Sequence, residues 1–190
     1  MGSLSESYAF VILGASGDLA KKKIYPTLWL LSRDNSIPKN TFFFGYARSD
    51  MTVSQVREKC SPYMKVSAED EASYEDFWRR NFYVRGSYDN KSDFESLDER
   101  IGKVGTPRTN RLFYLALPPS VFEGVTSNLK GCCMAKEGWT RVIIEKPFGK
   151  DSESSARLSN HLASLFHEDE LYRIDHYLGK EMVQNLMLVR

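Results

Sequence analysis

The chain lacks any apolar run of the roughly 18 residues that a membrane-spanning helix needs. Its N-terminus also lacks the basic segment, apolar stretch and cleavage site of a secretory signal peptide. A net charge of +1 over 190 residues gives no excess of positive charge for nucleic acid or for an anionic membrane surface. We therefore expect a cytoplasmic protein that binds neither nucleic acid nor membrane.

Cysteine is scarce as well, with three residues, of which Cys132 and Cys133 are adjacent. This number and spacing match neither a disulfide framework nor a metal-binding pattern, so we expect reduced, mostly buried thiols and no metal site. The apolar and charged fractions, 42% and 27%, are those of an ordinary globular protein. A chain of this length holds one good core, or one domain and the start of a second.

Short apolar runs alternate with segments of helical spacing along the chain. The run at 9–13 has the continuous apolar character of a strand buried on both faces. Alternation of strands and helices predicts an α/β fold with a doubly wound parallel sheet, a Rossmann-like dinucleotide-binding domain. The predicted strands are 9–13, 41–46, 81–86, 111–117, 141–144 and 171–174, and the predicted helices include 52–65, 68–80, 91–101, 120–130 and a segment capped by Asp151.

A glycine-spaced turn follows the first predicted strand and leads into a helical segment. Gly14 permits a tight turn there, and Gly17 lets a pyrophosphate approach the helix N-terminus. The spacing departs from G-x-G-x-x-G, because Ser16 and Ala20 replace two glycines. Such turns also occur without a nucleotide, so this one alone leaves both interpretations open. The candidate cofactor-binding residues of the turn are Gly14, Ala15, Ser16, Gly17, Asp18 and Leu19.

The helix after this turn is expected to carry Ile24, Leu28 and Leu31 on its buried side. Pro26 lies within it and either kinks the helix or marks its true first turn.

Arg48 follows the second predicted strand. In a doubly wound sheet this position faces the adenosine ribose, where an acid suits a free 2′-hydroxyl and an arginine suits a 2′-phosphate. Arg48 therefore favours NADP over NAD. Asp50, two residues further on, is an acid of the kind that suits a free 2′-hydroxyl and weakens this preference. The alternative for Arg48 alone is a surface arginine at a strand end.

Further polar residues follow the later strands. Lys146, fixed by Pro147, comes directly after strand 141–144, and Asp175, His176 and Lys180 crowd the junction that follows strand 171–174. Cations at a helix N-terminus are badly placed unless an anion joins them. A solvated turn is the alternative for each segment alone.

Because the carboxyl ends of parallel strands share one edge, these features should meet in one crevice. The glycine turn and Arg48 describe a dinucleotide phosphate site. Lys146, His176 and Lys180 describe a second cationic cluster, suited to a phosphorylated substrate. A nicotinamide cofactor beside such a substrate indicates hydride transfer, for which His176, oriented by Asp175, is the candidate base.

Four segments resemble the glucose-6-phosphate dehydrogenase family: Gly-Ala-Ser-Gly-Asp-Leu-Ala at 14–20, Gly-Tyr-Ala-Arg-Ser at 45–49, Glu-Lys-Pro-Phe-Gly at 145–149 and Arg-Ile-Asp-His-Tyr-Leu-Gly-Lys at 173–180. The likeness covers essentially the whole chain in order. It implies oxidation of glucose 6-phosphate at C1 to the 6-phospho-lactone, with NADP⁺ reduced to NADPH.

The resemblance also implies individual roles. It assigns NADP binding to residues 14–19, Lys23, Arg48 and Lys146, and substrate binding to Lys146, His176, Tyr177 and Lys180. In the family the base is a later histidine, polarised by the carboxylate that matches Asp175, and this sequence has no such histidine. The likeness thus assigns His176 to the substrate phosphate, whereas the residues alone suggest it as the base.

We therefore expect residues 1–176 to form the NADP-binding domain and 177–190 to begin a larger α+β substrate domain. The chain alone should bind NADP but turn over glucose 6-phosphate barely, and the full-length enzyme should be a homodimer or homotetramer. One alternative is a non-catalytic NADP sensor, which would not need the cationic cluster. The other is a short-chain dehydrogenase or sugar-nucleotide epimerase, whose Tyr-x-x-x-Lys pair is not matched, because Tyr177 and Lys180 are three apart.

Overall fold

The computed structural model describes residues 6–145 and 151–174. Within them, six parallel strands form one sheet in the order β3-β2-β1-β4-β5-β6. The order reverses between the two central strands, as in a doubly wound sheet, so the predicted fold is confirmed. The strands are β1 (Ser7–Leu13), β2 (Thr41–Ala47), β3 (Asn81–Arg85), β4 (Thr109–Leu115), β5 (Thr140–Glu145) and β6 (Leu171–Ile174).

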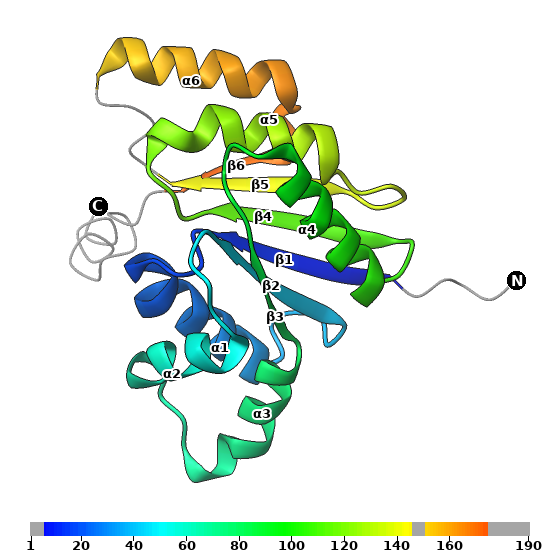
Figure 1. The fold of residues 1–190 in the computed structure, drawn as a ribbon. Coiled ribbons are helices and arrows are strands. Elements are labelled where there is room, and N and C mark those ends of the chain that lie inside the picture. Colours follow the sequence, from blue (N-terminus) through cyan, green and yellow to red (C-terminus); the bar gives the residue numbers. More distant parts are fainter. Residues whose placement is uncertain (1–5, 146–150, 175–190) are drawn as a thin grey trace, which may run out of the picture.

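Helices cover both faces of this sheet, which explains why its central strands read as continuous apolar runs. Helices α4, α5 and α6 pack on one face, and α1, α2 and α3 lie on the other (Figure 1). The central strand serves both cores, since Val11 and Leu13 point to the first face and Ile12 to the second. The helices are α1 (Tyr25–Arg33), α2 (Val53–Cys60), α3 (Glu71–Arg79), α4 (Lys91–Val104), α5 (Phe122–Cys132) and α6 (Ser152–Leu165).

The start of α6 is set by the capping residue predicted from the sequence. The Asp151 carboxylate accepts a hydrogen bond from the Ser154 backbone N–H at 2.8 Å, which confirms it as the cap of α6.

Cys60 and Cys133 are free and buried, as expected, and Cys132 is half-buried. No helix in the described part of the chain is both long and apolar enough to cross a bilayer.

The helix after the glycine turn differs from the expectation. Ile24 and Leu28 are buried, but Leu31 is 38% exposed, and Trp29 takes the core position instead. Trp29 packs edge-on against Tyr74 of α3, with ring centroids 5.1 Å apart, and this contact sets which side of α1 faces inward. A π-helical turn, Ala20–Ile24, precedes α1, and Pro26, which has no N–H to donate, lies in the first turn of α1.

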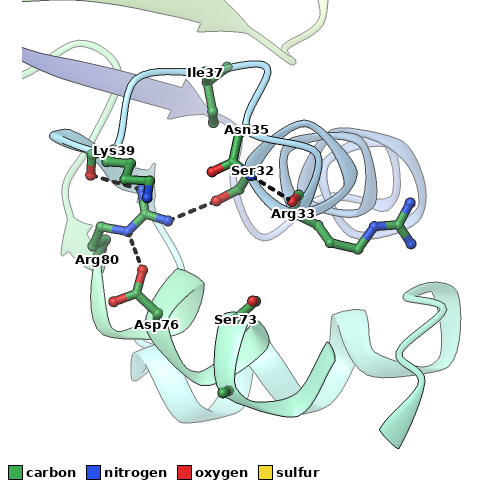
Figure 2. A pocket seen from close by; sticks show the side chains of 9 residues that line it. Ser32, Arg33, Asn35, Ile37, Lys39, Ser73, Asp76 and Arg80 are labelled. Carbon is green, nitrogen blue, oxygen red and sulfur yellow. Dashed lines mark hydrogen bonds and ion pairs between the residues drawn. The ribbon is translucent and has the colours of Figure 1, made fainter. Parts of the chain in front are cut away.

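Arg80 ties together the segments that precede β2 and β3. Its Nη1 donates to the carbonyl oxygens of Lys39 at 3.3 Å and Thr41 at 3.2 Å, and its Nη2 donates to Ser32 Oγ at 2.7 Å. Its Nε lies 3.2 Å from Asp76 Oδ2 (Figure 2). The guanidinium thus joins α1, α3 and the loop before β2.

A cavity of about 520 Å³ lies between α1, α3 and the loop before β2, and its lining includes Ser32, Lys39, Asp76 and Arg80 (Figure 2). The cavity lies at the amino ends of β2 and β3. The glycine turn lies on the opposite side of the sheet, at the carboxyl end of β1. Because the Arg80 donors are directed at protein acceptors, we interpret this cavity as part of the supporting framework.

Replacement of this arginine should destabilise the fold. Arg80→Ala is expected to lower the free energy of unfolding by about 1–3 kcal/mol, because the part-buried acceptors on Thr41 and Ser32 lose their donor. Arg79→Ala, at the exposed neighbouring position, is the matched control and should change it by less than about 0.5 kcal/mol. Urea unfolding followed by circular dichroism measures both, and equal effects of the two substitutions would contradict a stabilising role for Arg80.

Candidate functional site

The turn after β1 begins with a backbone conformation that residues other than glycine rarely adopt. Gly14 has a φ of +90°, and a Cβ there would lie 2.2 Å from the carbonyl oxygen of Ala116. The N–H groups of Gly14 and Ala15 both donate to the carbonyl oxygen of Tyr46, at 2.9 and 3.2 Å. The turn is therefore fixed between the ends of β2 and β4.

Gly17 plays a different part, because its backbone is not in the left-handed region and the residue lies at the surface. A Cβ on Gly17 would meet the Gly14 carbonyl oxygen at 3.2 Å, and the residue is exposed. Its own carbonyl oxygen accepts from the Lys21 N–H at 3.1 Å, so the helical segment begins at this point. The absent side chain thus opens a helix N-terminus to an approaching anion, as expected for a pyrophosphate site.

The first turn of this helix is cationic on balance. The Asp18 carboxylate lies 2.8 Å from Lys21 Nζ and 3.0 Å from Lys22 Nζ. These hydrogen bonds, with that of Lys21 the stronger, lower the pKa of Asp18 to about 2, so the group is ionised at neutral pH. Lys23 beside them is exposed. One carboxylate therefore stands among three ammonium groups at the proposed phosphate site.

Arg48 lies at the end of β2 as predicted. Its guanidinium stacks over the Tyr88 ring, 5.4 Å from the centroid. Asp50, which complicated the assignment, is directed elsewhere: its Oδ2 lies 3.5 Å from Arg85 Nη1. A cavity of about 460 Å³ opens here, lined by Arg48, Arg85, Gly86, Ser87 and Asp93. The end of β2 thus offers a guanidinium beside an open space, as a 2′-phosphate requires.

The glycine turn and the end of β2 are in direct contact. Ser49 Oγ donates to Ser16 Oγ at 3.2 Å, and the Tyr83 hydroxyl donates to the Ser49 carbonyl oxygen at 2.9 Å. A Cβ on Gly45 would lie 2.9 Å from the Cβ of Ala15, so a glycine within β2 allows this approach. The sequence analysis did not predict these contacts; the glycine inside a predicted strand is the signal that could have indicated them.

The later strands end at the same edge. β5 ends at Glu145 and β6 at Ile174, and both run parallel to β1. The residues predicted to hold substrate or to act in catalysis follow these ends and lie outside the described residues: Lys146, Asp175, His176, Tyr177 and Lys180. The predicted domain boundary at 176 lies outside them as well. The structure therefore brings together the coenzyme half of the predicted site, and the substrate half stays a prediction.

Comparison with known proteins identifies close relatives. A family model described as "Glucose-6-phosphate dehydrogenase, NAD binding domain" matches residues 11–185. The chain is 63% identical over 185 residues to a glucose-6-phosphate 1-dehydrogenase of Ceratitis capitata, and 61% identical over 184 residues to one of Drosophila melanogaster. Each match covers 96% of this chain but 35% of the relative, so the chain spans about a third of these proteins.

Solved structures agree with this likeness. A structure described as glucose-6-phosphate dehydrogenase in complex with its substrate glucose-6-phosphate matches with a TM-score of 0.89 and 44% identity, covering 100% of this chain and 41% of that one. A short chain dehydrogenase/reductase from Saccharomyces cerevisiae matches with a TM-score of 0.56 at 15% identity, covering 94% of this chain and 77% of that one. The second likeness is one of fold alone.

The positive φ at the turn gives a testable consequence. Gly14→Ala should lower the free energy of unfolding by about 2–4 kcal/mol, because the added methyl group is strained and meets the Ala116 carbonyl. Gly102→Ala in α4 is the matched control: its Cβ would meet nothing within 4 Å, and the change should stabilise the chain by about 0.5–1 kcal/mol. Urea unfolding measures both, and a neutral Gly14→Ala would contradict the described turn.

Proposed function

The chain belongs to the glucose-6-phosphate dehydrogenase family, and on that premise we propose that it forms the coenzyme-binding part of an enzyme that oxidises glucose 6-phosphate at C1 with NADP⁺. The observation that carries the proposal is the contact between the glycine turn and the end of β2, which brings a helix N-terminus and Arg48 to one edge of the sheet. A dinucleotide that carries a 2′-phosphate is complementary to both groups. When bound, NADP⁺ accepts the hydride from C1 and yields NADPH and the 6-phospho-lactone.

The proposed coenzyme contacts follow from the described geometry. The backbone at 14–19 would hold the pyrophosphate, the surrounding lysines, Lys23 among them, would supply positive charge, and Arg48 would bind the 2′-phosphate. The existing stack of Arg48 on Tyr88 orders the guanidinium before the ligand arrives, which reduces the entropy lost on binding.

The substrate side of the proposal depends on the likeness of residues 145–149 and 173–180 to the family. We propose that Lys146 contacts both coenzyme and substrate, that His176, Tyr177 and Lys180 hold the sugar phosphate, and that Asp175 polarises a histidine base. Lysine and a protonated histidine would neutralise the phosphate dianion. For the full-length protein we propose a cytoplasmic location and a homodimer or homotetramer.

Removal of the Arg48 charge should reduce affinity for one coenzyme only. Arg48→Gln is expected to raise the Kd for NADP⁺ by about 10–100-fold, because a charge-assisted contact to the 2′-phosphate is lost, and to leave the Kd for NAD⁺ within about twofold. Isothermal titration calorimetry on the 190-residue chain measures both constants.

Arg57→Gln is the matched control for that substitution. Arg57 is an arginine of α2 paired with Glu75, and its loss should not change either Kd. An equal loss of NADP⁺ and NAD⁺ affinity in Arg48→Gln would contradict a role for Arg48 at the 2′-phosphate.

The 190-residue chain alone should reduce NADP⁺ barely or not at all with glucose 6-phosphate, because the family's histidine base is not in this sequence. NADPH absorbance measures the rate, with a complete family enzyme as the reference. A rate near that reference would return the role of base to His176.

Glucose 6-phosphate should nevertheless raise the Tm of the chain. A chain that binds NADP⁺ but shows no such shift would favour the non-catalytic sensor.

A further inference from the structure

Asp50 and Arg85 form an ion pair beside the proposed coenzyme site, and the proposed function leaves this pair unused. Asp50 Oδ2 lies 3.5 Å from Arg85 Nη1, and the two side chains are 83% and 64% exposed. An acid near the end of β2 suits the free 2′-hydroxyl of NAD, whereas an arginine suits a 2′-phosphate. The pair thus joins one group of each kind next to the position that we propose for the 2′-phosphate.

Backbone contacts place Arg85 next to Arg48. The register of the sheet pairs Arg85, the last residue of β3, with Ala47, the last residue of β2, which Arg48 follows directly. The Gly86 N–H donates to the Ala47 carbonyl oxygen at 3.0 Å, and a Cβ on Gly86 would lie 2.3 Å from the Tyr46 hydroxyl oxygen. The chain therefore leaves β3 packed tightly against the end of β2, and the two arginines come from adjacent strand ends.

Both arginines line the same cavity. The space of about 460 Å³ at the end of β2 has Arg48 and Arg85 in its lining, against one carboxylate, that of Asp93, among the described residues there. Asp93 Oδ2 accepts a hydrogen bond from the Ser87 N–H at 2.8 Å. The lining therefore carries an excess of positive charge. A phosphate group with up to about two negative charges is matched better by two guanidinium groups than by Arg48 alone.

Arg85 has donors available for a ligand. A guanidinium has five N–H donors, and within residues 6–145 and 151–174 the Arg85 side chain has one polar partner, Asp50, at Nη1. An ion pair this exposed contributes little free energy, so the guanidinium can turn toward a phosphate at small cost. Nη2 and Nε can also reach a phosphate while Nη1 stays at Asp50. Arg85 can therefore bind the carboxylate and a phosphate at once.

We propose that Arg85 is a second determinant of coenzyme choice: it binds the 2′-phosphate of NADP together with Arg48, and it holds Asp50 away from the free 2′-hydroxyl of NAD. The inference deepens the proposed function and rests on it, because it requires a dinucleotide at the carboxyl ends of the strands. Arg85 contacts the coenzyme, and Asp50 acts through Arg85. Asp50 then does not weaken the preference for NADP, because its carboxylate is engaged by Arg85 and not by the ribose.

Equilibrium binding to the 190-residue chain tests this without turnover. Arg85→Gln should raise the Kd for NADP⁺ about five- to tenfold, because the 2′-phosphate loses a cation, and should lower the Kd for NAD⁺ about twofold, because Asp50 is released. The Kd values for 2′,5′-ADP and 5′-AMP should change in the same directions, which locates the effect at the 2′ position. Arg57→Gln, in the arginine of α2 paired with Glu75, is the matched control and should change none of the four constants.

Two further variants separate the roles of charge and of Asp50. Arg85→Gln combined with Asp50→Asn should return the Kd for NAD⁺ to that of the unsubstituted chain, while the Kd for NADP⁺ stays raised. Arg85→Lys, which keeps the charge but not the planar group, should lose less NADP⁺ affinity than Arg85→Gln. Circular dichroism establishes that each variant is folded, and Arg85→Lys supplies the measurement if Arg85→Gln is unstable.

Three results would overturn the inference. If Arg85→Gln leaves the Kd for 2′,5′-ADP within about twofold while Arg48→Gln raises it, Arg85 only pairs with Asp50 at the surface, and the proposed function stands. If Arg85→Gln raises the constants for NADP⁺ and NAD⁺ equally, or leaves that for NAD⁺ unchanged, Arg85 does not hold Asp50 away from the ribose. If the unsubstituted chain binds neither NADP⁺ nor 2′,5′-ADP, the proposed function fails, and this inference fails with it.

Discussion

The carbonyl oxygen of Tyr46 accepts hydrogen bonds from two successive N–H groups, those of Gly14 and Ala15. Through this bifurcated contact the turn after β1 is fastened to the end of β2, and the left-handed Gly14 conformation makes it possible. Arg48 follows Tyr46 by two residues. The spacing between the helix N-terminus and the backbone of Arg48 is therefore set by backbone hydrogen bonds, and the stack on Tyr88 then orders the guanidinium.

The polar groups at the amino ends of the strands differ in their partners from those at the carboxyl ends. At the edge where β2 and β3 begin, Arg80 directs its donors at protein acceptors and holds helices and loop together. At the carboxyl ends, polar groups lie on separate strands: the glycine turn follows β1, Arg48 follows β2, and Glu145 ends β5. The apolar cores on both faces keep these tips in register, since a parallel sheet buried on two sides resists slippage.

Much of this arrangement could be predicted from the sequence, because it depends on local patterns. Apolar runs marked the six strands, and Gly14, Gly17 and Arg48 marked the end of the sheet where we propose that the coenzyme binds. The orientation of α1 could not be predicted, because Trp29 is drawn inward by Tyr74, which belongs to a distant helix. The stack of Arg48 on Tyr88 and the diversion of Asp50 to Arg85 escaped prediction for the same reason: the partners come from β3 or from the loop after it.

The π-helical turn at Ala20–Ile24 places an extra residue in the helix that leads into α1. Hydrogen bonds from i to i+5 enclose one residue more than those of an α-helix, so loss of one lysine here would restore a regular α-helix and leave the residues beyond it facing the same way. Trp29 would stay in the core, but the helix N-terminus would hold one cation fewer. The π turn therefore adds a lysine to the proposed phosphate site without disturbing the packing of α1.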